Sequence, residues 1–207
     1  MKVRIDDNYT QAELAEITAG LIESSVITSS EMYADDELQK LEINFFNQVE
    51  LLYPAYERLV KYTRSDRKGW FDQSETANFY VWFTLQLLRG CQLQEYAPSC
   101  AFESGALEEE ETFVIQAGHI TISILSHKLN HPELISHIVG SVNRMLEQVG
   151  SKAAFYEIDI DEGSLFLLLS PQQYQKLLEE RLMRFSGVEY PEIEAWRATI
   201  REEDLPF

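Results

Sequence analysis

All four histidines of this 207-residue chain fall within residues 118–140, and histidine combines metal binding with proton transfer near neutral pH. They are His119, His127, His131 and His137. A metal site needs its ligands to converge on one point, and the elements that carry the ligands set that geometry. The predicted elements of this stretch therefore decide whether the histidines form a site.

The spacing within the cluster argues against a shared metal. His127 and His131 have the HxxxH spacing of a helical pair, but Pro132 disfavours the helical conformation at the residue before it. No glutamate follows His127, so the HExxH motif of zinc hydrolases is absent. We therefore predict no metal site and no cofactor. A hydrolase in which His127 or His131 holds a metal together with a carboxylate is the enzymatic alternative.

The remaining spacings also separate the histidines. His119 and His127 have the same parity on a predicted strand, where they would lie at opposite ends, roughly 26 Å apart. His137 follows Glu133 by one helical turn, on the side opposite the predicted apolar face. Such an arrangement is typical of a solvent-exposed pair.

A strand predicted over residues 153–161 places acidic side chains along one face. Glu157, Asp159 and Asp161 alternate with apolar residues, and Glu162 lies in the following turn. Successive carboxylates on one strand face are about 7 Å apart, which is costly unless water or cations match them. A solvated face, a divalent-metal site and a negative strip for a basic protein are the three interpretations. The strip is our predicted partner-binding site, because the sequence here lacks the further ligands of a calcium loop.

The balance of charge is the strongest global feature. Asp and Glu number 35 against 17 Lys and Arg, which gives a formal net charge of −18. Such a field repels nucleic acid and anionic membranes, and it speeds the encounter with a basic partner. The acidic run Glu108, Glu109, Glu110 and Glu111 is expected to assist the strip in binding that partner. Solubility alone would also explain an acidic chain.

Other sequence features favour a cytoplasmic, non-catalytic protein. No stretch approaches the ~20 apolar residues of a membrane span, and the first residues, MKVRIDDNYT, lack the apolar core of a signal peptide. Cys91 and Cys100 make a poor disulfide framework and lack CxxC spacing. The chain has no P-loop, no GxGxxG and no GxSxG motif.

The first part of the chain has the pattern of helices. A capping box from Thr10 to Glu13 predicts a helix that follows it. Apolar residues recurring every three or four positions predict a long helix over residues 35–63, interrupted near Pro54. An almost wholly apolar segment after Ser74 predicts a buried helix.

After a predicted loop at residues 97–112, the pattern changes to β-β-α-β-β-α and a tail helix. Strands are predicted at 112–116, 120–125, 153–161 and 165–169, and helices after Pro132, from Ser170 to Gly187 and after Pro191. We expect an α+β fold whose two hairpins form one four-stranded antiparallel sheet covered by helices. A single compact domain over 1–207 is predicted. Its alternative is an internal boundary at 97–112, between a helical part, 1–96, and an α+β part, 113–207.

The sequence thus predicts an acidic, non-catalytic module that neutralises or escorts a basic protein. An immunity protein or antitoxin for a cationic toxin, such as a nuclease, fits the charge best. The alternatives are the metal-assisted hydrolase and a structural or adaptor subunit of a larger assembly. We expect no direct binding to nucleic acid or membrane, and the sequence does not indicate the oligomeric state.

Overall fold

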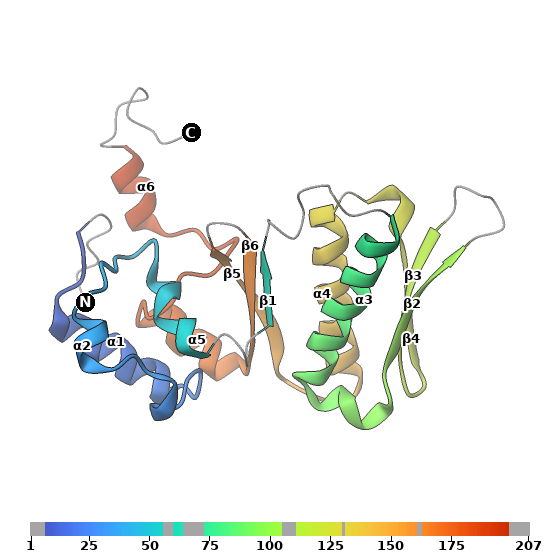
Figure 1. The fold of residues 1–207 in the computed structure, drawn as a ribbon, viewed down its shortest axis with the longest axis horizontal. Coiled ribbons are helices and arrows are strands. Elements are labelled where there is room, and N and C mark those ends of the chain that lie inside the picture. Colours follow the sequence, from blue (N-terminus) through green and yellow to red (C-terminus); the bar gives the residue numbers. More distant parts are fainter. Residues whose placement is uncertain are drawn as a thin grey trace. The chain divides into compact units, whose positions relative to one another are not determined.

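The computed structural model describes residues 7–55, 60–63, 73–104, 111–129, 131–160 and 163–198. Within these ranges, helices combine with two three-stranded sheets, which confirms the predicted α+β class (Figure 1). The strands are β1 (Val60–Thr63), β2 (Ser99–Ser104), β3 (Glu111–Ala117), β4 (Ile120–Leu125), β5 (Ala154–Ile160) and β6 (Gly163–Leu169). The α-helices are α1 (Gln11–Glu23), α2 (Asp35–Leu38), α3 (Gln73–Arg89), α4 (His131–Gln148), α5 (Pro171–Glu179) and α6 (Pro191–Arg197).

Short 3₁₀ helices complete the described secondary structure. They are η1 (Ser29–Glu31), η2 (Gln48–Ala55), η4 (Gln92–Tyr96) and η5 (Ser126–Lys128). None of the helices in the described ranges is both long enough and apolar enough to cross a lipid bilayer.

The chain divides into two compact units, each built from segments distant in the sequence. Unit 1 comprises Met1–Arg58, Glu157–Ile160 and Gln172–Phe207, and unit 2 comprises Leu59–Tyr156 and Asp161–Pro171. The boundary considered at residues 97–112 lies within unit 2, and one of the four points where the chain passes between the units, Tyr156/Glu157, falls inside β5. The expectation of a single domain stays a prediction.

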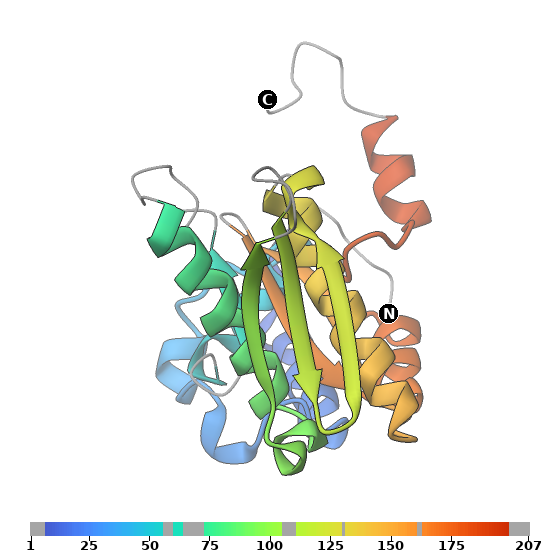
Figure 2. The ribbon, with the colours of Figure 1, turned by 90° about the vertical axis from the view of Figure 1, so that its right-hand side faces the viewer.

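Unit 2 places α3 and α4 between strands on two sides (Figures 1 and 2). On one side, Phe83 of α3 meets Phe166 of β6 edge-on, with ring centroids 5.6 Å apart. On the other side, α3 and α4 cover the β2-β3-β4 sheet, whose Phe113 and Ile115 are fully buried. The amphipathic pattern of α4 is explained by this packing, since its Ile138, Val142, Met145 and Leu146 belong to the same core.

The β2-β3-β4 sheet is antiparallel and alternates strictly between an inner and an outer face. Cys100 pairs with Ile115, and Ile115 with Ile122, in one inward row; Phe102, Phe113 and Ile124 form the next. The β3–β4 hairpin predicted around Ala117 and Gly118 is confirmed. Gly118 has a φ of +60°, a conformation that glycine adopts without steric cost.

The prediction that the two hairpins form one four-stranded sheet is wrong. The β3–β4 hairpin belongs to the sheet β2-β3-β4, and β5 and β6 belong to the sheet β1-β6-β5. Each sheet is completed by a strand that the sequence analysis did not predict. The first, β2, lies in the predicted loop at 97–112, and the second, β1, lies in the predicted long helix.

The long helix predicted over residues 35–63 is also wrong, although its apolar residues Leu38, Phe45, Val49 and Leu52 are buried as expected. Two asparagines divert the local backbone from helical pairing. Asn44 Oδ1 accepts from Phe46 N at 2.9 Å, and Asn47 Oδ1 accepts from Asn44 N at 2.7 Å. Beyond them, Pro54 lies in a 3₁₀ helix. Several short segments, rather than one helix, therefore carry the buried apolar residues.

In unit 1, α1 starts as predicted, with the Thr10–Glu13 capping box formed in both directions. The predicted extension of α5 to Gly187 is wrong, because the helix ends at Glu179. Leu182 N donates to Leu177 O and Arg181 N to Leu178 O, which is a Schellman motif with Arg181 at φ +58°. This left-handed position is usually occupied by glycine, so the sequence carried no obvious stop signal here.

Candidate functional site

The predicted acidic strip is described only at its start. Glu157 lies on β5 and is half-buried, and its carbonyl oxygen accepts from Ser186 N at 2.9 Å. Phe155, two residues earlier and so on the same strand face, is buried in the core of unit 2. This face therefore begins in a hydrophobic core rather than in solvent. The side chain of Asp159, and the whole of Asp161 and Glu162, lie outside the described residues.

The second acidic run is described only at its last member. Glu108, Glu109 and Glu110 lie outside the described residues, whereas Glu111 opens β3 and is exposed. Ser126 Oγ donates to the carbonyl oxygen of Glu111 at 2.9 Å, and His127 Nδ1 lies 3.2 Å from the same oxygen. The role of both acidic segments in partner binding stays a prediction.

The histidines of unit 2 lie in the turn before β4, in η5 and on α4. His119 lies in the turn before β4 and His127 in η5 after it, so the two lie at opposite ends of the strand as expected, and both are exposed. His131 is the first residue of α4, and His137 is exposed on that helix. Among the residues that the structure describes, no group of three His, Cys, Asp or Glu side chains is arranged to hold a metal ion. The metal-assisted hydrolase stays a prediction.

Both cysteines are free thiols in apolar surroundings. Burial raises the pKa of Cys91, and it raises the pKa of Cys100 to about 11. Since the thiolate is the nucleophile, both thiols are poorly suited to covalent catalysis at neutral pH.

An acidic cavity lies between α1 and the end of α5 in unit 1. It has a volume of about 470 Å³ and is lined by Glu16, Ile17, Ala19, Gly20, Glu23, Glu179, Glu180 and Leu182. Ile17 and Leu182 are buried, whereas the four glutamates are exposed. The cavity thus combines apolar lining with an exposed set of carboxylates.

The packing of α1 against the end of α5 produces this arrangement. Glu16, Gly20 and Glu23 follow one another at helical spacing, so they share a face of α1. A Cβ atom on Gly20 would lie 2.5 Å from Leu182 Cδ1, so glycine is what allows this close approach. Gln173 Nε2 donates to Ser24 O at 2.7 Å and fixes the other end of the contact.

One cation already meets this group of carboxylates. Lys176 Nζ lies 2.8 Å from Glu23 Oε2, and this hydrogen bond lowers the pKa of Glu23 and raises that of Lys176. The contact shows that a carboxylate of this group accepts a hydrogen bond from an ammonium group. Sequence reasoning missed the cavity; the spacing of Glu16, Gly20 and Glu23 was visible, but the contribution of α5 depends on the tertiary fold.

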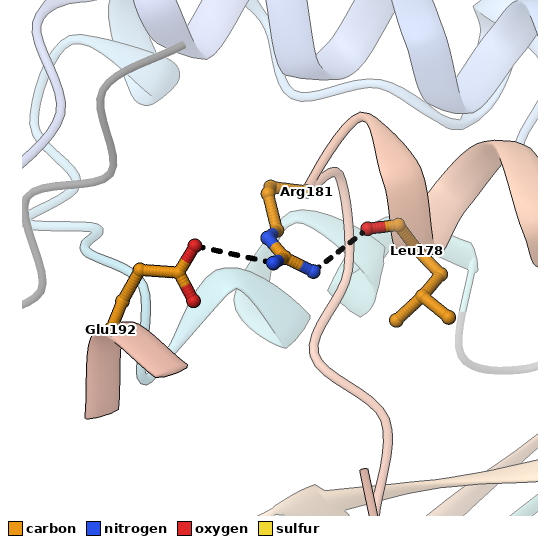
Figure 3. A network of polar contacts seen from close by, with 3 residues as sticks. All are labelled: Leu178, Arg181 and Glu192. Atoms are coloured by element: carbon orange, nitrogen blue, oxygen red, sulfur yellow. Dashed lines mark hydrogen bonds and ion pairs between the residues drawn. The ribbon is translucent and has the colours of Figure 1, made fainter. Parts of the chain in front are cut away.

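The end of α5 is also tied to α6. Arg181 Nη2 lies 3.2 Å from Glu192 Oε1, and its Nη1 donates to Leu178 O at 3.2 Å (Figure 3). The guanidinium carbon of Arg181 also lies 5.2 Å from the centroid of the Tyr190 ring. Through these contacts Arg181 stabilises the position of α6 and is already engaged, so we assign it a structural role.

Comparison with known proteins gave no match: no family model, no curated protein and no solved structure matches this chain.

Proposed function

We propose that this chain is a non-catalytic, acidic binding module that neutralises or escorts a basic protein partner. The observation that supports the proposal best is the cavity of unit 1, where four glutamates surround apolar residues on a chain of net charge −18. A basic partner would be drawn to this surface by the overall field and held by the local carboxylates.

The lining of the cavity suits a lysine or arginine side chain of the partner. The aliphatic stem of either residue packs on apolar groups such as the exposed Ala19, while the charged head reaches polar surroundings. Carboxylates at the opening would then accept charge-assisted hydrogen bonds, which are stronger than neutral ones. A guanidinium group is favoured over an ammonium group where two carboxylate oxygens are in reach.

The class of partner follows from the same chemistry. We propose an immunity protein or antitoxin that binds a cationic toxin, such as a nuclease, in the cytoplasm, where Cys91 and Cys100 stay reduced. The strip of Glu157, Asp159, Asp161 and Glu162 and the run Glu108–Glu111 are proposed as further contacts. In such a complex the acidic chain would compete with the phosphates that the basic partner binds.

The experiment that tests the proposal is capture of a partner by the wild-type chain and by a variant altered at the cavity. The variant is Glu16→Lys with Glu180→Lys, which places two cations at the opening. The control is Glu95→Lys with Glu147→Lys, which makes the same change in net charge at exposed positions of unit 2. A basic protein that binds the wild type and the control, is released by salt and is lost by the cavity variant supports the proposal. Equal capture by both variants would exclude the cavity as the contact.

A further inference from the structure

The strand β4 lies at one edge of the β2-β3-β4 sheet (Figure 2). A two-residue turn closes the β3–β4 hairpin, with Ala117 opposite Ile120. In such a hairpin the closing pair is hydrogen-bonded, and hydrogen-bonded and non-hydrogen-bonded pairs then alternate along the strands. The backbone N–H and C=O groups of Thr121, Ser123 and Leu125 therefore point away from β3.

These outward backbone groups form a regular row of donors and acceptors. Among the residues that the structure describes, none donates a hydrogen bond to them or accepts one from them. The row repeats every two residues, about 7 Å, which is the repeat of an extended peptide strand. An edge of this kind is a template for pairing with another strand.

The other edge strands in the described part of the chain carry features that oppose such pairing. The strand β5 is bonded to the side chain of Asn143 and to Ser186 N. The strands β1 and β2 contain Lys61 and Glu103, and a charged residue on an edge strand discourages pairing. The strand β4, with the sequence ITISIL, has no charged residue and no proline, and most of its residues are β-branched.

The chemistry of this edge indicates which occupant fits it. Strand addition to a sheet edge satisfies the free groups with main-chain hydrogen bonds, so the occupant is an extended peptide segment. A second copy of this chain has the same net charge of −18 and is repelled, whereas a segment of a basic protein is attracted. The exposed carboxylate of Glu111 lies beside the Leu125 end of the edge, with its Oε2 3.4 Å from Ser126 Oγ. A basic side chain at that end of the added strand would find a carboxylate there.

We propose that β4 binds an extended segment of the basic partner as a fourth strand of this sheet. The inference rests on the proposed function for the charge of the partner, and it adds the main-chain recognition by which unit 2 holds that partner. Leu125 is 53% exposed, so its side chain is free to contact a side chain on the added strand.

Amide hydrogen exchange of the full chain, followed by NMR, tests this inference. The probe is a short peptide of alternating valine and threonine with a lysine at each end. In the free chain, the outward amides of Thr121, Ser123 and Leu125 should exchange fast, because only the amides of Ile122 and Ile124 face β3. Saturating peptide is expected to slow exchange at the three outward amides by at least about tenfold and to leave the other two unchanged.

Two controls separate main-chain pairing from attraction by charge. The same peptide with N-methyl groups on alternate residues keeps its charge but cannot donate to the edge, so it should not slow exchange. Ser123→Pro removes the outward N–H without removing a hydrogen bond to β3, and should weaken peptide binding by about tenfold or more. Ser123→Val keeps this N–H and should bind as the wild type does. Circular dichroism establishes that both variants are folded.

The outcomes distinguish failure of this inference from failure of the proposed function. Unchanged exchange at the three outward amides, or equal slowing by the N-methylated peptide, would overturn the edge as a binding site. The test with the N-methylated peptide uses the wild-type chain, so it holds even where Ser123→Pro does not fold. Equal slowing by a peptide with glutamine in place of the lysines would keep the edge as a site but overturn a basic occupant, which is the part that depends on the proposed function.

Discussion

The side-chain amide of Asn143 pairs with both backbone groups of Phe155. Its Oδ1 accepts from Phe155 N at 2.7 Å, and its Nδ2 donates to Phe155 O at 3.1 Å. Because β5 is an edge strand in the order β1-β6-β5, Asn143 takes the place that a further strand would have at this point. Ser186 N donates a hydrogen bond to Glu157 O on the same strand. These contacts occupy the edge of β5 and protect it against pairing with another chain.

Replacing Asn143 should therefore destabilise the fold. Asn143→Leu removes both hydrogen bonds, and we expect a loss of about 1–3 kcal/mol in the free energy of unfolding. Asn143→Asp keeps the acceptor and loses the donor, so its loss should be smaller. Urea denaturation of the three proteins measures the difference, and equal stability of Asn143→Leu and the wild type would show that the pairing contributes nothing.

A glycine at position 25 should stabilise unit 1. Ser25 has a φ of +57° at the end of α1, where Ser25 N donates to Ile22 O and Val26 N to Leu21 O. Glycine adopts this left-handed conformation without the cost of about 1 kcal/mol that a Cβ atom brings. Thermal unfolding should show a higher midpoint for Ser25→Gly and no such gain for Ser25→Ala; a lower midpoint for Ser25→Gly would contradict the assignment of this C-cap.

At position 20, by contrast, we predict that replacing the glycine destabilises the fold, because α1 approaches Leu182 closely there. Alanine has a higher helix propensity than glycine by about 1 kcal/mol, so Gly20→Ala would stabilise an isolated helix. Here the new Cβ atom would lie 2.5 Å from Leu182 Cδ1, and moving this buried side chain costs about 1–3 kcal/mol. We expect net destabilisation in chemical denaturation. In the Leu182→Val background, which lacks the δ-methyl groups, Gly20→Ala should be less costly; the same cost in both backgrounds would disprove the contact.

The buried Tyr9 links stability to alkaline pH. Burial raises the pKa of Tyr9 from 10.0 to about 12, despite the hydrogen bond that its hydroxyl accepts from Gln48 Nε2. A raised pKa favours the neutral form in the folded state, so this contribution is complete below pH 10 and is lost between about pH 10 and pH 12. The shift corresponds to roughly 3 kcal/mol.

The matched variant for this prediction is Tyr9→Phe. Burial also raises the pKa values of Tyr33 and Tyr190, so the wild type carries more than one alkaline contribution. The unfolding free energy of the wild type minus that of Tyr9→Phe should decrease as the pH rises from 10 to 12, because only the wild type loses the contribution of Tyr9. A constant difference over this range would show that Tyr9 ionises equally in both states.

Local signals in the sequence were sufficient for most elements, and long-range pairing explains the errors. The Thr10–Glu13 capping box and the amphipathic stretch after Pro132 each predict a helix that the structure contains. The strand β2 alternates inward Cys100 and Phe102 with outward small and acidic residues, but it is short, and its pairing with β3 is visible only in the fold. The strand β1 forms by pairing with β6, far away in the sequence, against a helical pattern.

The candidate site was less predictable than the fold. The proposed class of partner rests on net charge, which the composition gives without knowledge of the fold. The cavity, however, requires α1 and the end of α5 to meet, and α5 ends where Arg181 occupies a position that glycine normally holds. No local pattern joins Glu16 to Glu180.

The most direct test of the proposed function is the affinity of the captured basic partner for the wild type and for the Glu16→Lys, Glu180→Lys variant, measured by titration calorimetry at two salt concentrations. The account predicts binding that weakens with salt, a loss of about tenfold or more in the cavity variant, and a smaller loss in the Glu95→Lys, Glu147→Lys control. Equal losses in the two variants would mean that only net charge matters, and binding that ignores both salt and the cavity would contradict the account.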